Sequence, residues 1–403
     1  MSDFKPLDID RSHVNDRHWN LESLSQTYKI NPNRELFSLW IGDHDFQVPI
    51  KVQEAIQQRL AVPVYGYAFL PQTFYEAIIK WNKEQFNLTY KKENIILSHG
   101  TIAAMIMTIK AFSNPGEAIL LTSPIYGPFG EAIKNTNRSL VAHKLLYKNN
   151  RFEIDLALFE KQIVDEKVKI FLLCNPHNPG GQVWDYSILL EIVNICKKHK
   201  VIIFSDEVHR DIIFKETKFT SLAHFESLYD QVIVGVSPNK PFNFGGFKTT
   251  YILVKNESLN NSLKQELVKT KMTSPNTFGV PALIAAYECA DWLKDFNAYI
   301  EDNYHFIVNA LKTENDLSIF DTNASFFVYV NFSQLTTNPS LFKEVMEANN
   351  IILAYGDSFV QDGEYFARIN IGIGRAKLER FVQQFKFALA EVRTKVNKIN
   401  YIN

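Results

Sequence analysis

Cysteine is scarce in this sequence of 403 residues. The three cysteines, Cys174, Cys196 and Cys289, are an odd number, have no metal-ligand spacing and each lie in an apolar segment. We therefore expect buried free thiols in a reducing cytoplasm, with neither disulfides nor a metal site.

Long apolar runs and an excess of one charge are also lacking. No apolar run reaches the length of a membrane span, and residues 1–5 have neither the basic nor the apolar region of a signal peptide. Lysine and arginine total 43 against 44 aspartate and glutamate, a formal net charge of −1. No bulk field then attracts the protein to nucleic acid or to an anionic membrane, so we expect neither as a partner.

What the sequence has is an alternation of short apolar runs and amphipathic stretches from about residue 94 to 254. The runs do not alternate with polar residues, as is typical of buried parallel strands. Helical patterns at 102–112 and 187–199 lie between some of them, which indicates an open α/β sheet with helices on both faces. The predicted strands are residues 95–97, 118–121, 170–173, 201–204, 232–236 and 251–254.

The rest of the chain has a different pattern. One long helical pattern is followed by a strand, a helix and a second strand, which indicates a smaller α+β domain. These predicted elements are residues 281–311, 325–330, 341–349 and 365–371. Hydrophobic residues make up 46% of the chain, and its length suits two unequal domains. We assign residues 46–285 to the large domain, and 1–45 with 286–403 to an N-terminal arm and the small domain.

Two loops that follow predicted strands present groups to which a ligand could bind, backbone N–H groups in one and asparagine amides in the other. Ser98-His99-Gly100-Thr101 opens a helix, where Gly100 permits close approach and the free N–H groups suit an anion. Residues 175–181, Asn-Pro-His-Asn-Pro-Gly-Gly, form a stiff loop that presents two asparagine amides. Ligands of such sheets bind beyond the carboxyl ends of the strands.

Two further loops supply ionisable groups. Asp206 and Glu207 follow the strand at 201–204, where Asp206 either faces the crevice or caps a helix. Lys240 follows the strand at 232–236 within Ser237-Pro-Asn-Lys240, among apolar and proline residues. A lysine that loses hydration there has a lowered pKa and becomes a nucleophile, whereas a solvated lysine would be ordinary.

The four loops together resemble the pyridoxal 5′-phosphate (PLP) enzymes of fold type I, the aspartate-aminotransferase-like superfamily. The order and spacing of the phosphate loop, Asn-Pro-x-Asn-Pro-x-Gly, Asp206 and Ser-x-x-Lys240 carry this resemblance over nearly the whole chain. It is closest to the MalY/PatB-type carbon–sulfur lyases. The segments that indicate this branch are residues 39–46, 65–67, 175–184 and 206–209.

The resemblance implies a role for each matching residue. Lys240 would hold PLP as a Schiff base and act as the base on Cα, Asp206 would pair with the pyridine nitrogen, and Tyr126 would stack on the ring. Asn178 would bind the 3′-oxygen, and Arg368 would bind the α-carboxylate of an amino-acid substrate. The implied phosphate-side and remaining cofactor contacts are Gly100, Thr101, Ile102, His209, Ser237, Lys248 and, from the neighbouring subunit of a homodimer with shared sites, Tyr67.

This chain departs from the family pattern in three places. His209 stands where many aminotransferases have tyrosine, as it commonly does in the lyase branch. Lys248 stands where many have an arginine on the phosphate, and lysine lacks the bidentate geometry. Gly42-Asp43-His44 replaces the usual Ala-Asp-Met of the lyases, which changes the expected shape of the substrate pocket.

Other classes of protein fit less well. Ser-x-x-Lys also marks penicillin-recognising hydrolases, but there it opens a helix, and no Lys-Thr-Gly follows here. No Gly-x-Gly-x-x-Gly follows a strand, which disfavours a nicotinamide site. The sequence has the full set of implied cofactor and substrate residues, from Lys240 to Arg368. This disfavours a regulatory or binding protein that keeps the fold without the activity.

Two reactions remain open, because both begin with removal of the Cα proton by Lys240. In β-elimination a thiolate leaves Cβ, and pyruvate and ammonia follow. In transamination the proton returns to the cofactor. Only the family resemblance favours the carbon–sulfur lyase, acting on L-cystathionine or related cysteine S-conjugates, over a class I/II aminotransferase.

Overall fold

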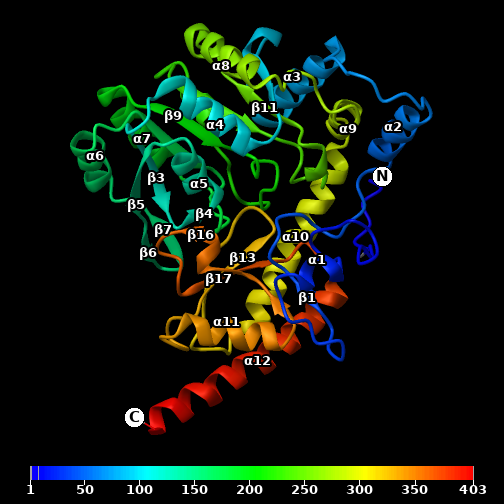
Figure 1. Cartoon of the computed structure of the whole chain (residues 1–403), viewed down its shortest axis with the longest axis vertical. Coiled ribbons are helices and arrows are strands. Elements are labelled where there is room, and N and C mark those ends of the chain that lie inside the picture. The colour runs from blue at the N-terminus through cyan, green and yellow to red at the C-terminus, as the bar shows by residue number, and fades with distance from the viewer. Residues whose placement is uncertain (1, 8, 403) are drawn as a thin grey trace.

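The structure is a computed structural model that describes residues 2–7 and 9–402, with backbone only for 399–402. Residues 1 and 8 of the predicted arm and residue 403 of the predicted small domain lie outside the described residues. Figure 1 shows a larger upper part built on one sheet and a smaller lower part from which helix α12 extends.

The described part of the chain contains helices throughout its length. Their bounds are α1 (Leu21–Ser25), α2 (Ile50–Leu60), α3 (Gln72–Phe86), α4 (Thr101–Phe112), α5 (Pro128–Asn135), α6 (Leu156–Asp165), α7 (Tyr186–His199), α8 (Glu257–Thr270), α9 (Gly279–Ala286), α10 (Ala290–Leu311), α11 (Pro339–Ala348) and α12 (Arg375–Ile402). Four 3-10 turns accompany them, η1 (Lys92–Asn94), η2 (Leu222–Phe225), η3 (Gly245–Phe247) and η4 (Gly356–Ser358).

The large sheet has seven strands in the order β2-β11-β10-β9-β8-β3-β5. All neighbours are parallel except β11, which is antiparallel to both β10 and β2. The strands are β2 (Ile95–Ser98), β3 (Ala118–Ser123), β5 (Ser139–Lys144), β8 (Ile170–Cys174), β9 (Ile202–Asp206), β10 (Val232–Val236) and β11 (Thr250–Leu253). The predicted α/β class is therefore confirmed, with one reversed strand.

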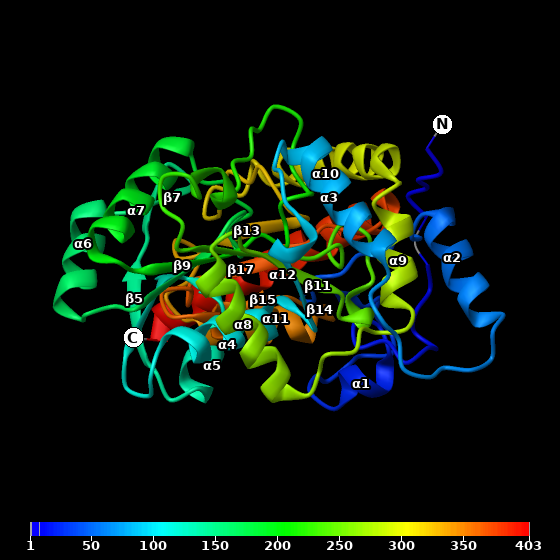
Figure 2. The same ribbon diagram turned by 90° about the horizontal axis from the view of Figure 1, so that it is seen from above.

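Both faces of this sheet are covered because successive strand residues point to opposite sides. Ile119 packs with α4, α5 and α8, whereas Leu120 belongs to the core that includes α6 and α7. Neither side chain is exposed to solvent. In Figures 1 and 2 the helices accordingly lie on two sides of the sheet.

The small part is built on the antiparallel sheet β12-β13-β17-β15. Its strands are β12 (Ser318–Ile319), β13 (Phe327–Asn331), β15 (Ala354–Tyr355) and β17 (Phe366–Asn370). The short pairs are β1 (Phe37–Ser38) with β14 (Ile351–Ile352), β6 (Leu146–Lys148) with β7 (Arg151–Glu153), and β4 (Ile125–Tyr126) with β16 (Phe359–Val360). The division at residues 45 and 285 remains a prediction.

Helix α10 connects the two parts. The single long helix predicted over 281–311 is wrong at one point, because α9 ends at Ala286 and α10 begins at Ala290. The break leaves Tyr287 free to stack on Trp81, with ring centroids 4.7 Å apart, and to share a hydrogen bond with the hydroxyl of Tyr251. Side-chain packing of this kind overrides an apolar period that would continue the helix.

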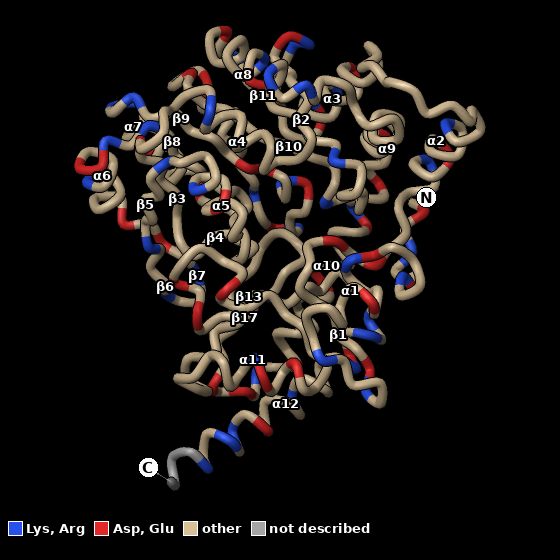
Figure 3. The backbone as a smooth tube through the Cα atoms, in the orientation of Figure 1, with Lys and Arg blue, Asp and Glu red and all other residues tan. Residues whose placement is uncertain are grey.

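Charge is spread over the whole molecule. In Figure 3 the lysine and arginine positions are interspersed with aspartate and glutamate over both parts of the molecule. Among the described residues, no helix is both long enough and apolar enough to cross a membrane. Cys174, Cys196 and Cys289 are buried and free, so their predicted burial is confirmed.

Candidate active site

Lys240 lies in the loop after β10, and its Nζ donates a hydrogen bond to the Gly42 carbonyl, 2.5 Å away. Removal from water, followed by the positive charge of Arg368, lowers the pKa of Lys240 to about 8 against the opposing effects of Asp43 and Asp206. An amine with a pKa near neutrality is a usable nucleophile and base.

Asp206 ends β9, the strand beside β10, and lies next to Gly235 in the parallel register. Its side chain is buried, and its Oδ1 accepts a hydrogen bond of 3.1 Å from the Val208 N–H. Burial raises the pKa of Asp206 to about 6, while the Val208 bond and the charge of Lys240 oppose that shift. The charge of Lys240 therefore acts on this carboxylate, but among the described residues no cation forms an ion pair with it.

Arg368 comes from the small sheet and joins the site to the loop after β8. Its Nη1 donates to Asn178 Oδ1 at 2.7 Å, and its Nη2 donates to the Trp40 carbonyl at 2.6 Å. The guanidinium lies 3.9 Å from the ring centroid of Phe327, and burial lowers the pKa of Arg368 to about 10. Its Nε has no hydrogen-bond partner among the described residues, so a donor remains for a substrate carboxylate.

The start of α4 forms an open backbone cradle. Gly100 is the N-cap with φ 120°, and a Cβ built on it would meet nothing within 4 Å. No side chain caps this helix, so the N–H groups of its first turn, which includes Thr101 and Ile102, are available to an anion. A phosphate group fits this position by charge and by space.

Two residues that were predicted to bind the phosphate, Ser237 and Lys248, make other interactions in the structure. The Ser237 hydroxyl is buried and donates to the Thr249 carbonyl at 2.6 Å. Lys248 is exposed and has a left-handed backbone at φ 54°. Its positive charge contributes to the lowered pKa of Lys240. Their contact with the phosphate stays a prediction.

His209 and Tyr126 border the same site. The Ser325 hydroxyl hydrogen-bonds His209 Nδ1 at 2.9 Å, and burial followed by the charges of Lys240 and Arg368 moves the pKa of His209 well below its usual value. His209 is therefore a neutral ring. The Tyr126 backbone N–H donates to the Asn178 carbonyl, while its side chain is 38% exposed and so remains available to stack on a ring.

The Gly42 carbonyl is a contact that sequence reasoning did not assign. A Cβ at Gly42 would lie 2.7 Å from Lys240 Nζ and 3.2 Å from the Phe327 ring, so glycine leaves room for the lysine. Asn370 donates to the carbonyls of Ile41 and Asp43 on either side. The departure from the lyases' Ala-Asp-Met was the only sequence signal of this contact.

Tyr67 is not brought to the site within one chain. Its side chain is fully exposed, and the neighbouring Val64, Tyr65 and Phe69 are more than half exposed. Figure 2 shows this segment looping out between α2 and α3. The prediction that Tyr67 acts in a partner subunit is untested by a single chain.

These residues fit PLP on three observations. The N–H cradle at Gly100 suits a phosphate, the buried Asp206 carboxylate suits a protonated ring nitrogen, and the Lys240 amine has the lowered pKa needed for attachment. The role of Arg368 towards an amino acid carboxylate stays a prediction. Among the described residues, no group of three or more His, Cys, Asp or Glu side chains could hold a metal ion.

Comparison with known proteins gives the same assignment of family and cofactor. A family model described as aminotransferase class I and II matches residues 34–385. Cystathionine beta-lyase PatB of Bacillus subtilis (strain 168) is 29% identical over 378 residues, which cover 91% of this chain and 97% of that protein.

Two solved structures are similar over almost their entire length. The PLP-bound C-S lyase from Staphylococcus hominis has a TM-score of 0.88 and 29% identity, covering 95% of this chain and 97% of that one. Cystalysin from Treponema denticola, which contains PLP, has a TM-score of 0.91 and 26% identity, covering 97% and 100%. This likeness confirms the predicted fold.

Proposed function

This chain belongs to the aminotransferase class I and II family of PLP-dependent enzymes, and from that premise we propose that it is a carbon–sulfur β-lyase. The substrate class is L-cystathionine or related cysteine S-conjugates, and the products are pyruvate, ammonia and a thiol. The observation that carries the choice is the likeness to PatB and to the S. hominis lyase across more than nine-tenths of this chain.

The chemistry that PLP supplies when bound is an electron sink for the pair left on Cα. Asp206 would hold the proton on the ring nitrogen, and the Gly100–Ile102 backbone and Lys248 would bind the phosphate. Asn178 would bind the 3′-oxygen, and Tyr126 would cover the ring face.

Arg368 orients the substrate by its α-carboxylate, using the free Nε and the planar fork. Lys240 Nζ, with its pKa lowered to about 8, removes the Cα proton. The Cβ–S bond then breaks, the sulfur leaves as a thiolate, and hydrolysis of the remaining fragment releases pyruvate and ammonia.

Transamination is the alternative, because the family includes aminotransferases and the first proton transfer is the same. A third candidate is a regulatory or binding protein that keeps the fold. The test is incubation of the PLP-loaded protein with L-cystathionine and assay of pyruvate and free thiol, with a keto-acid acceptor as control. Keto-acid-dependent turnover without thiol would identify an aminotransferase. A colourless protein without amino-acid turnover would favour the third candidate.

We further propose that the active form is a cytoplasmic homodimer in which Tyr67 completes the partner's phosphate site. The support is the exposed aromatic stretch at 62–71, since a soluble monomer rarely leaves so many large apolar side chains together in water. The three buried free thiols suit a reducing compartment.

The shared site predicts a difference in PLP retention between hybrid and parent dimers. Lys240→Ala subunits are mixed with subunits carrying both Tyr67→Phe and Arg368→Ala. One hybrid site then lacks only Arg368 and keeps the partner's Tyr67, so it should retain PLP longer than the double-mutant homodimer during dialysis. Equal retention, or a fully active monomer by sedimentation, would contradict the shared site.

Arg368→Lys should mainly raise KM for amino acids, because a point charge replaces the planar fork. Loss of a bidentate contact in a buried site costs on the order of 2–5 kcal/mol. Steady-state kinetics measure the change, and an amine analogue without the carboxylate is the control, whose KM should be the same in both proteins. If the variant binds carboxylate substrates as well as the parent, Arg368 has another role.

A further inference from the structure

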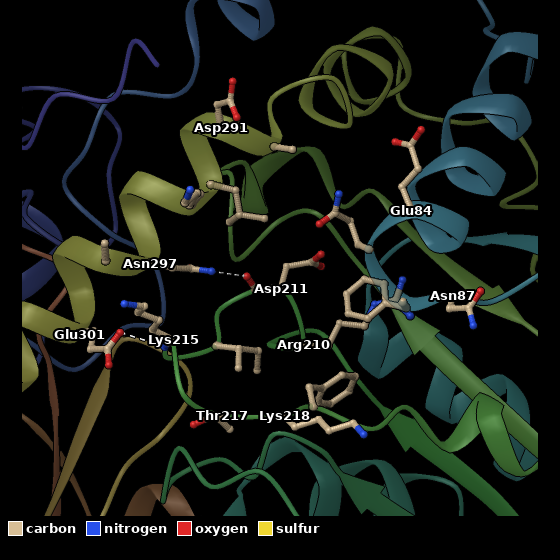
Figure 4. Close-up of a pocket in the computed structure, with 18 of the residues that line it drawn as sticks. Glu84, Asn87, Arg210, Asp211, Lys215, Thr217, Lys218, Asp291, Asn297 and Glu301 are labelled. Atoms are coloured by element: carbon tan, nitrogen blue, oxygen red, sulfur yellow. Dashed lines mark hydrogen bonds between the residues drawn. The ribbon is translucent and has the colours of Figure 1, made fainter. Parts of the chain in front are cut away.

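The loop that carries His209 is held in place by backbone hydrogen bonds on two sides. The Asn297 amide of α10 donates to the Asp211 carbonyl at 2.9 Å, as Figure 4 shows. The Ile212 N–H donates to the His209 carbonyl at 3.0 Å, and the Ile212 carbonyl accepts a 2.8 Å hydrogen bond from the Ser325 N–H. The backbone around His209 is therefore fixed without any help from the Ser325 side chain.

The Ser325 hydroxyl makes one further contact with this loop. Its Oγ lies 2.9 Å from His209 Nδ1, and the described residues give this hydroxyl no other hydrogen-bond partner. Ser325 is 2% exposed and has a left-handed backbone at φ 70°. A residue other than glycine keeps such a backbone only where its surroundings hold it there.

This contact determines which nitrogen of His209 carries the proton. Burial and the positive charges of Lys240 and Arg368 keep the ring neutral, so one of its two nitrogens is protonated. A buried hydroxyl hydrogen needs an acceptor, and within the described part of the chain Nδ1 is the acceptor next to Ser325. The hydroxyl therefore donates to Nδ1, and the ring proton lies on Nε2.

The Nε2–H group of His209 is free to bind a ligand of the site. Nε2 has no hydrogen-bond partner among residues 2–7 and 9–398, and it is not closed off from solvent. The ring packs edge-on against Phe326 and Phe327, with centroids 5.9 and 5.5 Å away, which limits its rotation. Asn178, to which the 3′-oxygen of PLP is assigned, is bonded to Arg368, whose charge acts on His209. That oxygen is therefore the cofactor acceptor that suits Nε2–H.

We propose that Ser325 is a positioning residue, which donates to Nδ1 and so holds His209 ready to donate Nε2–H to the 3′-oxygen of bound PLP. This role rests on PLP binding and not on the choice between elimination and transamination. A donor at the 3′-oxygen stabilises its negative charge. Without the donor, more of that charge acts on the nitrogen that Lys240 shares with the cofactor, and this nitrogen holds its proton more tightly.

The test is the absorption of the PLP-loaded protein, measured against pH without substrate, because this absorption reports the proton on the Lys240 nitrogen. Ser325→Ala removes only the hydroxyl and should raise the midpoint of the titration by about 0.5–1 pH unit, as expected for one lost hydrogen bond. Ser113→Ala is the matched control. Its buried hydroxyl donates to the Ile109 carbonyl at the far end of α4, so the midpoint should not move. An unchanged or lowered midpoint in Ser325→Ala overturns the inference.

A double-mutant cycle separates this role from a general loss of packing. His209→Phe keeps an aromatic ring beside Phe326 and Phe327 but has no ring nitrogen. If Ser325 acts through His209, then adding Ser325→Ala to His209→Phe should leave the midpoint unchanged. The same upward shift in both backgrounds would contradict the inference. Because no substrate is present, the expected shifts in a protein that fails to cleave cystathionine would count against the proposed reaction only.

Discussion

Lys240→Ala is expected to abolish covalent attachment of PLP and to lower turnover by several orders of magnitude. Among the described residues, Lys240 is the lysine whose amine reaches the Gly42 carbonyl at the site and whose pKa falls to about 8. Both the nucleophile and the Cα base are lost together, because one amine serves both roles.

Borohydride reduction followed by peptide mapping measures the attachment. The parent should carry the reduced pyridoxyl group on the peptide that contains Lys240, and the variant should carry none. Lys197→Ala is the matched control, because that exposed lysine of α7 has no part in the proposed site and should leave attachment intact. A pyridoxyl group on any other lysine of the parent would refute the assignment.

Asp206→Asn is expected to keep PLP bound while turnover falls by several orders of magnitude. An amide has the shape of the carboxylate but cannot hold a proton on the ring nitrogen, so the electron sink is lost. Burial raises the pKa of Asp206 to about 6 in the free chain, and the positive charge of a protonated ring would favour its ionised form.

The absorption of bound PLP and kcat together measure this effect. The exposed Asp295→Asn is the control for an aspartate-to-asparagine change that does not touch the site. The expected pattern is retained absorption with lost kcat. Near-normal turnover in Asp206→Asn would show that the carboxylate does not act on the ring.

The strands of the large sheet were predictable because buried parallel strands are short apolar runs between helical patterns. Val232–Val236 coincides with β10, and the other five predicted strands match within two residues. The reversal of β11 was not predictable from its composition, since an apolar run carries no direction. The strand β5, with several half-exposed residues, gave a weaker signal and was missed.

The contacts around Lys240 were partly predictable. The family resemblance implied that Lys240, Asp206 and Arg368 share one site, and in the structure the charges of Asp206 and Arg368 both act on Lys240. The Gly42 carbonyl and Asn370 were not found, because their contacts join residues 198 and more than 300 positions apart in the chain. Such pairs depend on how the small sheet packs on the large one, and no local pattern encodes that packing.

The pairing of β4 with β16 has a mechanical consequence. Phe359 of the small part lies in register with Tyr126, and the Ser123 hydroxyl donates to Asp362 at 2.6 Å. Phe359 also packs against Arg368, 5.6 Å from its guanidinium. Tyr126 itself belongs to the large part, where its backbone N–H donates to the Asn178 carbonyl. The β4–β16 pairing therefore ties the small part that carries Arg368 to the residue expected to stack on the ring, and any rotation of the small sheet would first have to break this pairing.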